Sequence, residues 1–460
     1  MCNKLFVALA VLGVTVIAVA PASAEDEIFP YTIHEKALDN GLRIVVIPYD
    51  SPGTVAFMTA VRTGSRDEVE PGHSGFAHFF EHMMFRGTDK YSGDEYNDLL
   101  KRMGADSNAD TSDDRTRYYL TGPAVELETM MDMESDRFKH LDYSEEVFKR
   151  EALAVLGEYN KNISSPFLPM WERLRELAFQ QHTYSHTTMG YLDDIKAMPD
   201  YYDYSLGFFA RFYRPENSVL LVVGDADPEE VFTLAAKYYG DWEPGYQEPT
   251  VAAEPPQEEH QESHIDWPAP IRPYLMAGYR IPAFSSETVD TAALGIIEQL
   301  LFSESAPLYQ QLMVEDQWVD SLQTINFDHR DPYLFTIFSR IKSNDLVPKV
   351  QAAIDEHIQK LQDELVDAEY LERVKSHMRY SFALGLNSPD ALRDVIGTYL
   401  WVTGDPSEVN RIYAQYQKVT PEDIQRVARE TFQPNQTTTV TLSYPASDEA
   451  ATGATTGAGR

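Results

Sequence analysis

The sequence predicts an α+β fold in which two homologous α/β domains are joined by a linker. Strand-like apolar segments alternate with helix-like amphipathic segments in both halves of the chain. Residues 245–263, GYQEPTVAAEPPQEEHQES, are rich in Pro, Glu and Gln and have almost nothing to bury. FYRPENSVLLVV (212–223) and TFQPNQTTTVTL (431–442) share an aromatic residue, a nearby Pro and Asn, and then a strand, as two copies of one unit would.

A chain of 460 residues with 43% hydrophobic and 24% charged residues has ordinary globular composition and can bury a large core. We expect five parts along it. They are a signal peptide (1–24), an N-terminal domain (25–245), an acidic Pro-rich linker (246–267), a C-terminal homologous domain (268–446) and a disordered low-complexity tail (447–460).

Residues 1–24 have the pattern of a secretory signal peptide. One Lys precedes an apolar run from Leu5 to Ala20, and the small-residue ending Ala22-Ser23-Ala24 forms a cleavage site. A retained membrane anchor is the alternative, although the run is short for a bilayer span. No later stretch is apolar enough to cross a membrane, so we expect export across the inner membrane into the periplasm without a span in the mature chain.

Cysteine content and charge exclude several functions. The one cysteine, Cys2, lies in the predicted signal peptide, so a metal in the mature chain must use His and carboxylate ligands. A formal net charge of −35 repels nucleic acid and anionic membrane surfaces. We interpret the acidic surface as a solvated one, and attraction of basic peptides is the alternative.

Four segments of the first half are predicted to be strands. IVVIPYD (44–50) and TVAFMTAVRTG (54–64) are apolar and separated by the turn residues Ser51-Pro52-Gly53. RTRYYLTG (115–122) and SVLLVVGD (218–225) follow the same logic further along the chain.

Two segments between these strands are predicted to be helices, in addition to residues 75–88. VELETMMDMESDRFKHL (125–141) is amphipathic. SEEVFKREALAVLGEYN (144–160) has Ser at the N-cap position and two Glu residues in its first turn, which favour the start of a helix.

The stretch GFAHFFEHMMFRGT (75–88) carries three polar side chains in an apolar run. On a helix, His78 and His82 are four residues apart and share one face, where two imidazoles can bind one zinc ion. Glu81 lies beside the pair and can reach a water without being a ligand. The alternative is a buried pair of histidines without a metal, which would be costly unless the polar groups were compensated.

A third ligand is offered by the helix predicted over 144–160. Glu151 and Glu158 are two helical turns apart, so they share a face, and Leu153, Val155 and Leu156 lead us to expect that this part is mostly buried. Two acids on a buried face need a cation. A surface pairing with Lys149 or Arg150 is the alternative.

The motif H-x-x-E-H, followed 76 residues later by a Glu with another Glu seven before it, resembles the pitrilysin/insulinase family of zinc metallopeptidases. The similarity extends through GTDKYS (87–92), SNADTSDDRTRYY (107–119) and RFYRPENSVLLVVGDADPEEV (211–231). It covers almost the whole mature chain and matches the short two-domain members in length. The resemblance implies an antiparallel-rich sheet covered by helices in each domain, and a chain that forms half of a clamshell chamber.

The family's site residues map onto this sequence one by one. The resemblance implies that the N-terminal domain is catalytic and binds one zinc ion through His78, His82 and Glu158. It implies that Glu81 is the general base and that Glu151 is a further catalytic-site carboxylate that tunes the zinc ligands.

The resemblance also implies how substrate binds. Asn108 and Ala109 would lie beside a strand to which a peptide adds as an extra strand, a mode that tolerates many sequences. From its own residue type, Asn108 is equally typical of a turn. We therefore expect a zinc endopeptidase that acts on peptides or small unfolded polypeptides.

The second half departs from the family pattern. Members that work alone carry there an Arg and a Tyr seven residues on, which stabilise the oxyanion. In SAPLYQQLMVEDQWVDSL (305–322), Met313 and Asp320 occupy these positions, and Arg330 and Tyr333 lie at the wrong offset. The resemblance therefore implies the zinc-bearing subunit of a heterodimer, whose homologous partner carries the Arg/Tyr pair. The alternative is a zinc-containing peptide-binding or chaperone-like module.

Three other histidines are not expected to bind metal. His182 and His186 repeat the spacing of four but lie among Thr, Ser and Gln without an adjacent Glu, so we expect a loop. His73 is expected to be a solvated loop residue.

Overall fold

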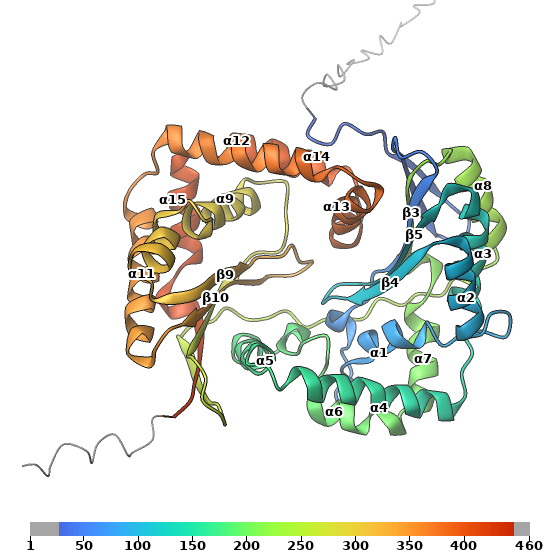
Figure 1. The fold of residues 1–460 in the computed structure, drawn as a ribbon, viewed down its shortest axis with the longest axis horizontal. Helices are drawn as coiled ribbons and strands as arrows, with labels where there is room; N and C mark the ends of the chain where they lie inside the picture. Colours follow the sequence, from blue (N-terminus) through green and yellow to red (C-terminus); the bar gives the residue numbers. More distant parts are fainter. Residues whose placement is uncertain (1–26, 446–460) are drawn as a thin grey trace, which may run out of the picture.

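The structure, a computed structural model, describes residues 27–445, which form two β-sheets with helices packed against them (Figure 1). The predicted signal peptide (1–24) and the predicted tail (447–460) lie outside the described residues. Within residues 27–445, no helix combines the length and the apolar character that a bilayer span requires.

The first sheet has six strands in the order β1-β2-β6-β3-β5-β4. Strand β2 is parallel to β6 and every other neighbouring pair is antiparallel. The apolar runs predicted as strands form its centre, where β6 is buried along its whole length. The strands are β1 (His34–Ala37), β2 (Arg43–Pro48), β3 (Thr54–Val61), β4 (Asp106–Thr111), β5 (Thr116–Pro123) and β6 (Ser218–Gly224).

The second sheet repeats this pairing pattern with five strands in the order β7-β11-β8-β10-β9. Strand β7 is parallel to β11, and the other pairs are antiparallel, as between β2 and β6 and their neighbours. The strands are β7 (Gln261–Asp266), β8 (Tyr274–Ile281), β9 (Val319–Ile325), β10 (Tyr333–Ile341) and β11 (Thr437–Ser443).

The internal repeat seen in the sequence marks equivalent elements of the two sheets. A short 3-10 turn that begins with Pro leads into β6 in the first half (Pro215–Asn217) and into β11 in the second (Pro434–Gln436). In each sheet the strand that follows pairs with the sheet's one parallel neighbour. The predicted α+β fold of two homologous domains with antiparallel-rich sheets is therefore confirmed.

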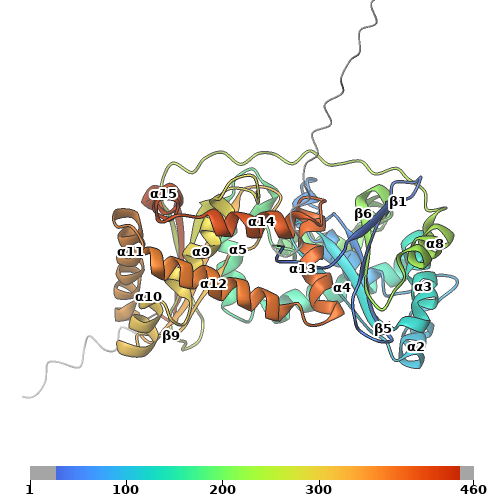
Figure 2. The same ribbon diagram turned by 90° about the horizontal axis from the view of Figure 1, so that it is seen from above.

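Residues 243–260 contain no helix or strand, and they run along one side of the molecule (Figure 2). The last part of the predicted linker differs from the expectation, because Gln261–Asp266 form β7. This strand alternates between half-buried and exposed residues and is short and polar, as an edge strand is. We propose that this linker separates the two domains and that it ends at residue 260, directly before β7.

Most helices of the first half pack against the first sheet or against one another. The predictions of helices over 125–141 and 144–160 are confirmed by α3 and α4, and the Ser144 hydroxyl accepts a hydrogen bond from the Val147 N–H (3.3 Å) as an N-cap does. The helices are α1 (Phe76–Met83), α2 (Gly93–Met103), α3 (Leu127–His140), α4 (Glu145–Asn162), α5 (Phe167–Ala178), α6 (Leu192–Ala197), α7 (Tyr202–Phe212) and α8 (Pro228–Tyr239).

The helices of the second half begin directly after β8. A π-helical segment, Gln310–Glu315, continues α10 toward β9. The helices are α9 (Asp290–Phe302), α10 (Pro307–Tyr309), α11 (Val347–Asp363), α12 (Ala368–Gly385), α13 (Pro389–Val402), α14 (Glu408–Lys418) and α15 (Pro421–Thr431).

The two domains exchange one helix each. Helix α5 of the first half packs on β8 and β11 of the second sheet, and α13 of the second half packs on β3 and β6 of the first. Both helices lie between the sheets (Figure 1). As a result Met58, Leu174, Leu275 and Leu400 belong to one continuous apolar core. This shared core sets the orientation of the two domains, because separating them would expose apolar surface from both.

Candidate metal centre

Helix α1, which carries the H-x-x-E-H motif, is short and is held at its N-terminus. Gly75 precedes it with φ of +90°, and a Cβ atom there would lie 2.7 Å from the Met189 carbonyl oxygen, so only glycine fits without strain. The buried Glu68 carboxylate accepts hydrogen bonds from the N–H groups of Gly75 (2.8 Å) and Ala77 (2.7 Å). These bonds satisfy donors that a helix leaves free at its start.

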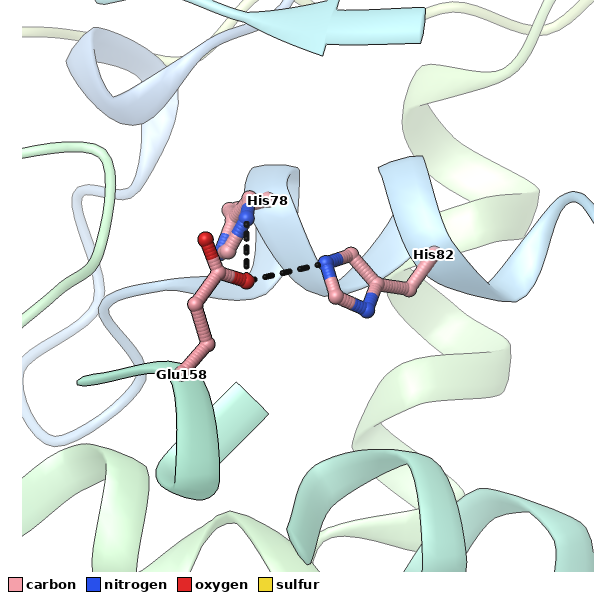
Figure 3. Close-up of side chains that lie close together, drawn as sticks. All are labelled: His78, His82 and Glu158. Carbon is pink, nitrogen blue, oxygen red and sulfur yellow. Dashed lines mark ion pairs between the residues drawn. The ribbon is translucent and has the colours of Figure 1, made fainter. Parts of the chain in front are cut away.

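The apolar side chains of α1 pack into the core, and its histidines face α4. The rings of His78 and His82 lie with their centroids 4.8 Å apart and their planes at 79°. Helix α4 places Glu158 opposite them (Figure 3). The Glu158 Oε2 atom is 3.6 Å from His78 Nε2 and 3.3 Å from His82 Nε2. Among residues 27–445, these three form the one group of His, Cys, Asp or Glu side chains placed to share a metal ion.

The geometry of this group fits zinc. Ligands at about 2.0–2.2 Å from a tetrahedral ion lie roughly 3.3–3.6 Å from one another, which is the separation of Glu158 from both imidazoles. The distance of 3.6 Å to His78 is too long for a hydrogen bond. Two imidazoles and one carboxylate are also a donor set of catalytic zinc sites with three protein ligands.

Burial and the neighbouring His82 lower the pKa of His78 to about 4, so this imidazole is neutral at neutral pH, as a metal ligand must be. Hydrogen bonds to Glu151 and Glu158 raise the pKa of His82 to about 9 in the metal-free protein. A hydrogen bond to His82 lowers the pKa of Glu158, which is ionised.

Glu151 lies behind His82 and is buried, with 2% of its surface exposed. Its carboxylate accepts a hydrogen bond from His82 Nδ1 (3.0 Å) and pairs with the guanidinium of Arg86 at 2.5 and 2.9 Å. Burial raises the pKa of Glu151, but the bonds from His82 and Arg86 outweigh burial and lower it to about 2. An acceptor at Nδ1 leaves Nε2 of the same ring free for a metal.

Glu151 does not form the alternative surface pair with Lys149, because Lys149 pairs with Glu145 on the exposed face of α4. The expectation that Leu153 helps to bury this helix is wrong, since 58% of its surface is exposed. Val155 is buried as expected. Arg86, which sequence reasoning did not identify, follows His82 by four residues, and that spacing was the available signal.

Glu81 lies beside the histidines but outside the group of three. Its carboxylate accepts a hydrogen bond from the Thr111 hydroxyl (2.7 Å), which comes from the end of β4. Burial raises the pKa of Glu81, and the bond from Thr111 opposes that rise. A partly buried carboxylate with a raised pKa next to a metal centre is suited to accept and return a proton.

Asn108 and Ala109 lie on β4, at the edge of the first sheet. Strand β4 pairs with β5 on one side, and α1 packs nearby. Asn108 is exposed, and its side-chain oxygen accepts a hydrogen bond from the Ala109 N–H (2.9 Å). Asn108 is therefore part of a strand and not of a turn, and the other edge of that strand has no partner among the described residues.

The residues at the two positions where the resemblance leads us to expect an Arg/Tyr pair have other contacts. Met313 packs against the shared core, and the Asp320 carboxylate accepts a hydrogen bond from Arg272. Tyr333 is buried with its hydroxyl bonded to Asp113 (3.0 Å), and the backbone N–H of Arg330 bonds to Asp114 (2.9 Å).

The other histidines do not form a second group of possible metal ligands within residues 27–445. His182 and His186 flank a 3-10 turn and are buried, and His182 Nε2 lies 3.1 Å from Asp331. His73 is half-buried and stacks on Tyr204 at 4.0 Å between ring centroids.

A cavity of about 600 Å³ lies between the domains, next to the end of β4. Ser112, which follows Thr111, contributes to its wall, together with Trp171 of the first half and Phe327 and Trp401 of the second. Aromatic residues from both domains thus line a space beside the turn that follows β4, and none of the candidate metal ligands contributes to its wall.

Comparison with known proteins finds a family and relatives that match most of the chain. Residues 44–191 match the family described as insulinase (peptidase family M16), and residues 202–378 match the peptidase M16 inactive domain. "Zinc protease PqqE" of Helicobacter pylori is 27% identical over 89% of this chain and 92% of that protein.

Two solved structures share the fold. The crystal structure of a protease from Helicobacter pylori, 27% identical, covers 90% of this chain and 100% of that one with a TM-score of 0.85. The periplasmic protease PqqL from Escherichia coli, 19% identical, covers 91% of this chain but 48% of that one, with a TM-score of 0.74. The matched parts of these two proteins share the two-domain fold expected of half of a clamshell.

Proposed function

Because this chain belongs to the insulinase family of peptidases (peptidase family M16), we propose that it is a zinc-dependent endopeptidase. The observation that carries the proposal is the position of Glu158 at tetrahedral-edge distances from both His78 and His82, with Glu81 beside this group. Zinc is the metal named for the relatives. We propose one zinc ion per chain, held by these three residues.

The roles of the residues follow from their contacts. A bound zinc ion polarises a carbonyl and lowers the pKa of a water to about 7. Glu81 accepts the proton of the attacking water and returns it to the leaving amine, and Thr111 holds the carboxylate in place through its hydroxyl. Glu151 does not reach the group of ligand atoms and orients His82 instead, so it is a positioning residue.

The substrate we propose is an extended peptide or a small unfolded polypeptide. The free edge of β4, the strand that carries Asn108 and Ala109, would pair with a peptide that adds as a seventh strand. Backbone hydrogen bonds carry affinity without reading side chains, and the adjacent cavity has room for bulky ones.

We further propose that the chain is one subunit of a heterodimer. Neither Met313 nor Asp320 is able to stabilise an oxyanion, since Asp320 is a carboxylate engaged with Arg272. The PqqL chain is about twice the length matched here, which supports a complete unit built from two halves. A homologous partner that carries the Arg/Tyr pair would then complete the site, in the periplasm if residues 1–24 act as a signal.

The test is peptide hydrolysis by the purified zinc-loaded chain, alone and co-purified with a homologous partner lacking H-x-x-E-H. We expect hydrolysis with the partner, and its loss in Glu81→Gln with zinc still bound. Glu298→Gln is the matched control, because Glu298 of α9 similarly accepts a bond from a Thr hydroxyl, that of Thr324. Full activity of the lone chain would contradict the proposed heterodimer. Unchanged activity of Glu81→Gln would contradict the proposed role of this chain as a zinc endopeptidase.

The missing oxyanion donors favour one other function, a zinc-containing peptide-binding or chaperone-like module. Such a module would bind peptides along β4 equally well in the wild type and in Glu81→Gln, and neither protein would hydrolyse them with any partner. Measuring peptide binding and turnover on the same two proteins therefore separates the two functions.

A further inference from the structure

The second domain contacts the candidate active site at the turn that joins β4 to β5. This turn, residues 112–115, is closed by a hydrogen bond from the Ser112 N–H to the Arg115 carbonyl (2.8 Å). The loop between β9 and β10 reaches toward it across the space between the sheets (Figure 1). That loop and the start of β10 bring His329 and Tyr333 against the turn.

Both domains hold one carboxylate of the turn, that of Asp113, which is 8% exposed. Its Oδ2 atom accepts a hydrogen bond from the Tyr333 hydroxyl (3.0 Å) and lies 3.3 Å from His329 Nε2. Its Oδ1 atom accepts bonds from Arg175 Nη2 (2.6 Å) and the Ser65 hydroxyl (2.8 Å). A buried carboxylate needs such partners, and four of them confine it to one position.

The residues from the second domain are themselves fixed. His329 Nδ1 lies 2.8 Å from the Phe327 carbonyl oxygen, and the imidazole stacks on the ring of Tyr333 with centroids 3.5 Å apart. The neighbouring Asp114 accepts a hydrogen bond from the backbone N–H of Arg330 (2.9 Å). The loop thus presents a rigid set of donors to the turn.

The turn is connected directly to the proposed general base. Thr111 is separated from Asp113 by Ser112 alone, and its hydroxyl donates to the Glu81 carboxylate at 2.7 Å. This is the one hydrogen bond that the described residues provide to that carboxylate. A hydrogen bond is sensitive to small displacements of its donor, so the position of the turn determines the orientation of Glu81.

We propose that Asp113, His329 and Tyr333 are positioning residues through which the second domain holds Thr111 and, through Thr111, the carboxylate of Glu81. The inference rests on the proposed function, because it assigns to Glu81 the role of base. It gives the second domain of this chain a part in catalysis although that domain has neither zinc ligands nor oxyanion donors. The three positioning residues affect the chemical step and not the binding of zinc or peptide.

The test is a double-mutant cycle between Tyr333→Phe and Thr111→Val in the zinc-loaded chain with its partner. We expect Tyr333→Phe to lower kcat about tenfold, with KM and zinc affinity within about twofold of wild type. The double variant should be no slower than Thr111→Val alone, because both changes break the same connection. Thr111→Ser, which keeps the hydroxyl, should retain most of the activity. Tyr143→Phe is the matched control, a buried tyrosine whose hydroxyl bonds to Ser205 (2.9 Å).

Losses that multiply in the double variant, or a Tyr333→Phe variant that behaves like Tyr143→Phe, would overturn the inference. Hydrogen exchange of the backbone over 106–118 provides a readout that does not need activity. Faster exchange there in Tyr333→Phe and in His329→Gln than in Tyr143→Phe supports the inference, and unchanged exchange overturns it. An inactive wild type with this exchange pattern would contradict the proposed function alone.

Discussion

Replacing Glu151 by Gln should weaken zinc binding, although Glu151 is not one of the three residues proposed to bind the ion. The carboxylate accepts a hydrogen bond from His82 Nδ1 at 3.0 Å and pairs with Arg86 at 2.5 and 2.9 Å while 2% exposed. Oε1 receives both His82 Nδ1 and Arg86 Nη2, and Oε2 faces Arg86 Nε. An amide keeps one oxygen, so its NH2 group would face a donor at one of these two positions, and the negative charge behind His82 would be lost.

The magnitude follows from these contacts. A hydrogen bond to a charged group contributes about 1.5–3 kcal/mol, and each 1.4 kcal/mol is about a factor of ten in an equilibrium constant. Losing the charged acceptor behind His82 should therefore lower zinc affinity roughly 10- to 100-fold, which is the usual effect of changing a residue that orients a metal-binding histidine.

The assay is competition with a chromophoric chelator at fixed pH, on wild type, Glu151→Gln and Glu145→Gln. Glu145 lies on the same helix and pairs with Lys149 at the surface, so it controls for a charge change on α4. Equal zinc affinity in Glu151→Gln and wild type, with both folded, would refute the idea that Glu151 orients His82.

Further variants test the contacts that hold the candidate site in place. Glu68→Gln removes one of the two side-chain oxygens that accept from backbone N–H groups at the start of α1, and it should lower the unfolding free energy by about 1–3 kcal/mol in denaturant titration. Gly75→Ala, strained at φ +90° and blocked by Met189, should cost about 1–3 kcal/mol, and a stable variant would contradict the strain. Burial lowers the pKa of His329, but its hydrogen bond to Asp113, the charges of Asp113 and Asp114 and the Phe327 carbonyl together outweigh burial and raise it. Its stabilising effect is thus complete below about pH 6.5 and declines as pH rises through the raised value, so the stability gap between wild type and His329→Gln should narrow at alkaline pH.

The sequence was most informative where the chemistry is local. Spacing of four on one helix brought His78 and His82 together, and spacing of seven placed Glu151 and Glu158 on one face of α4. These patterns work because an α-helix repeats its faces at fixed intervals, whatever surrounds it. The capping residue Ser144 was predictable for the same reason.

Such patterns do not predict contacts between segments that are distant in the sequence. Residues 261–266 read as polar linker, yet they form β7 because β11, far along the chain, offers a parallel edge. Leu153 suggested burial by its type, but it lies on the outer face of α4. Strand pairing and exposure depend on what packs against a segment, and hydrophobicity alone does not encode the partner.

By itself, the sequence determined the repeated α/β unit and the candidate ligands that the structure brings together, and the resemblance added the lack of an Arg/Tyr pair at the expected positions. The tertiary structure alone decided that α5 and α13 are exchanged between the sheets, that Arg86 backs Glu151, and that Asp113 of the first domain is held by the second. The physical reason is that residue type and spacing encode short-range geometry, whereas burial of one shared core brings together groups that no local spacing relates.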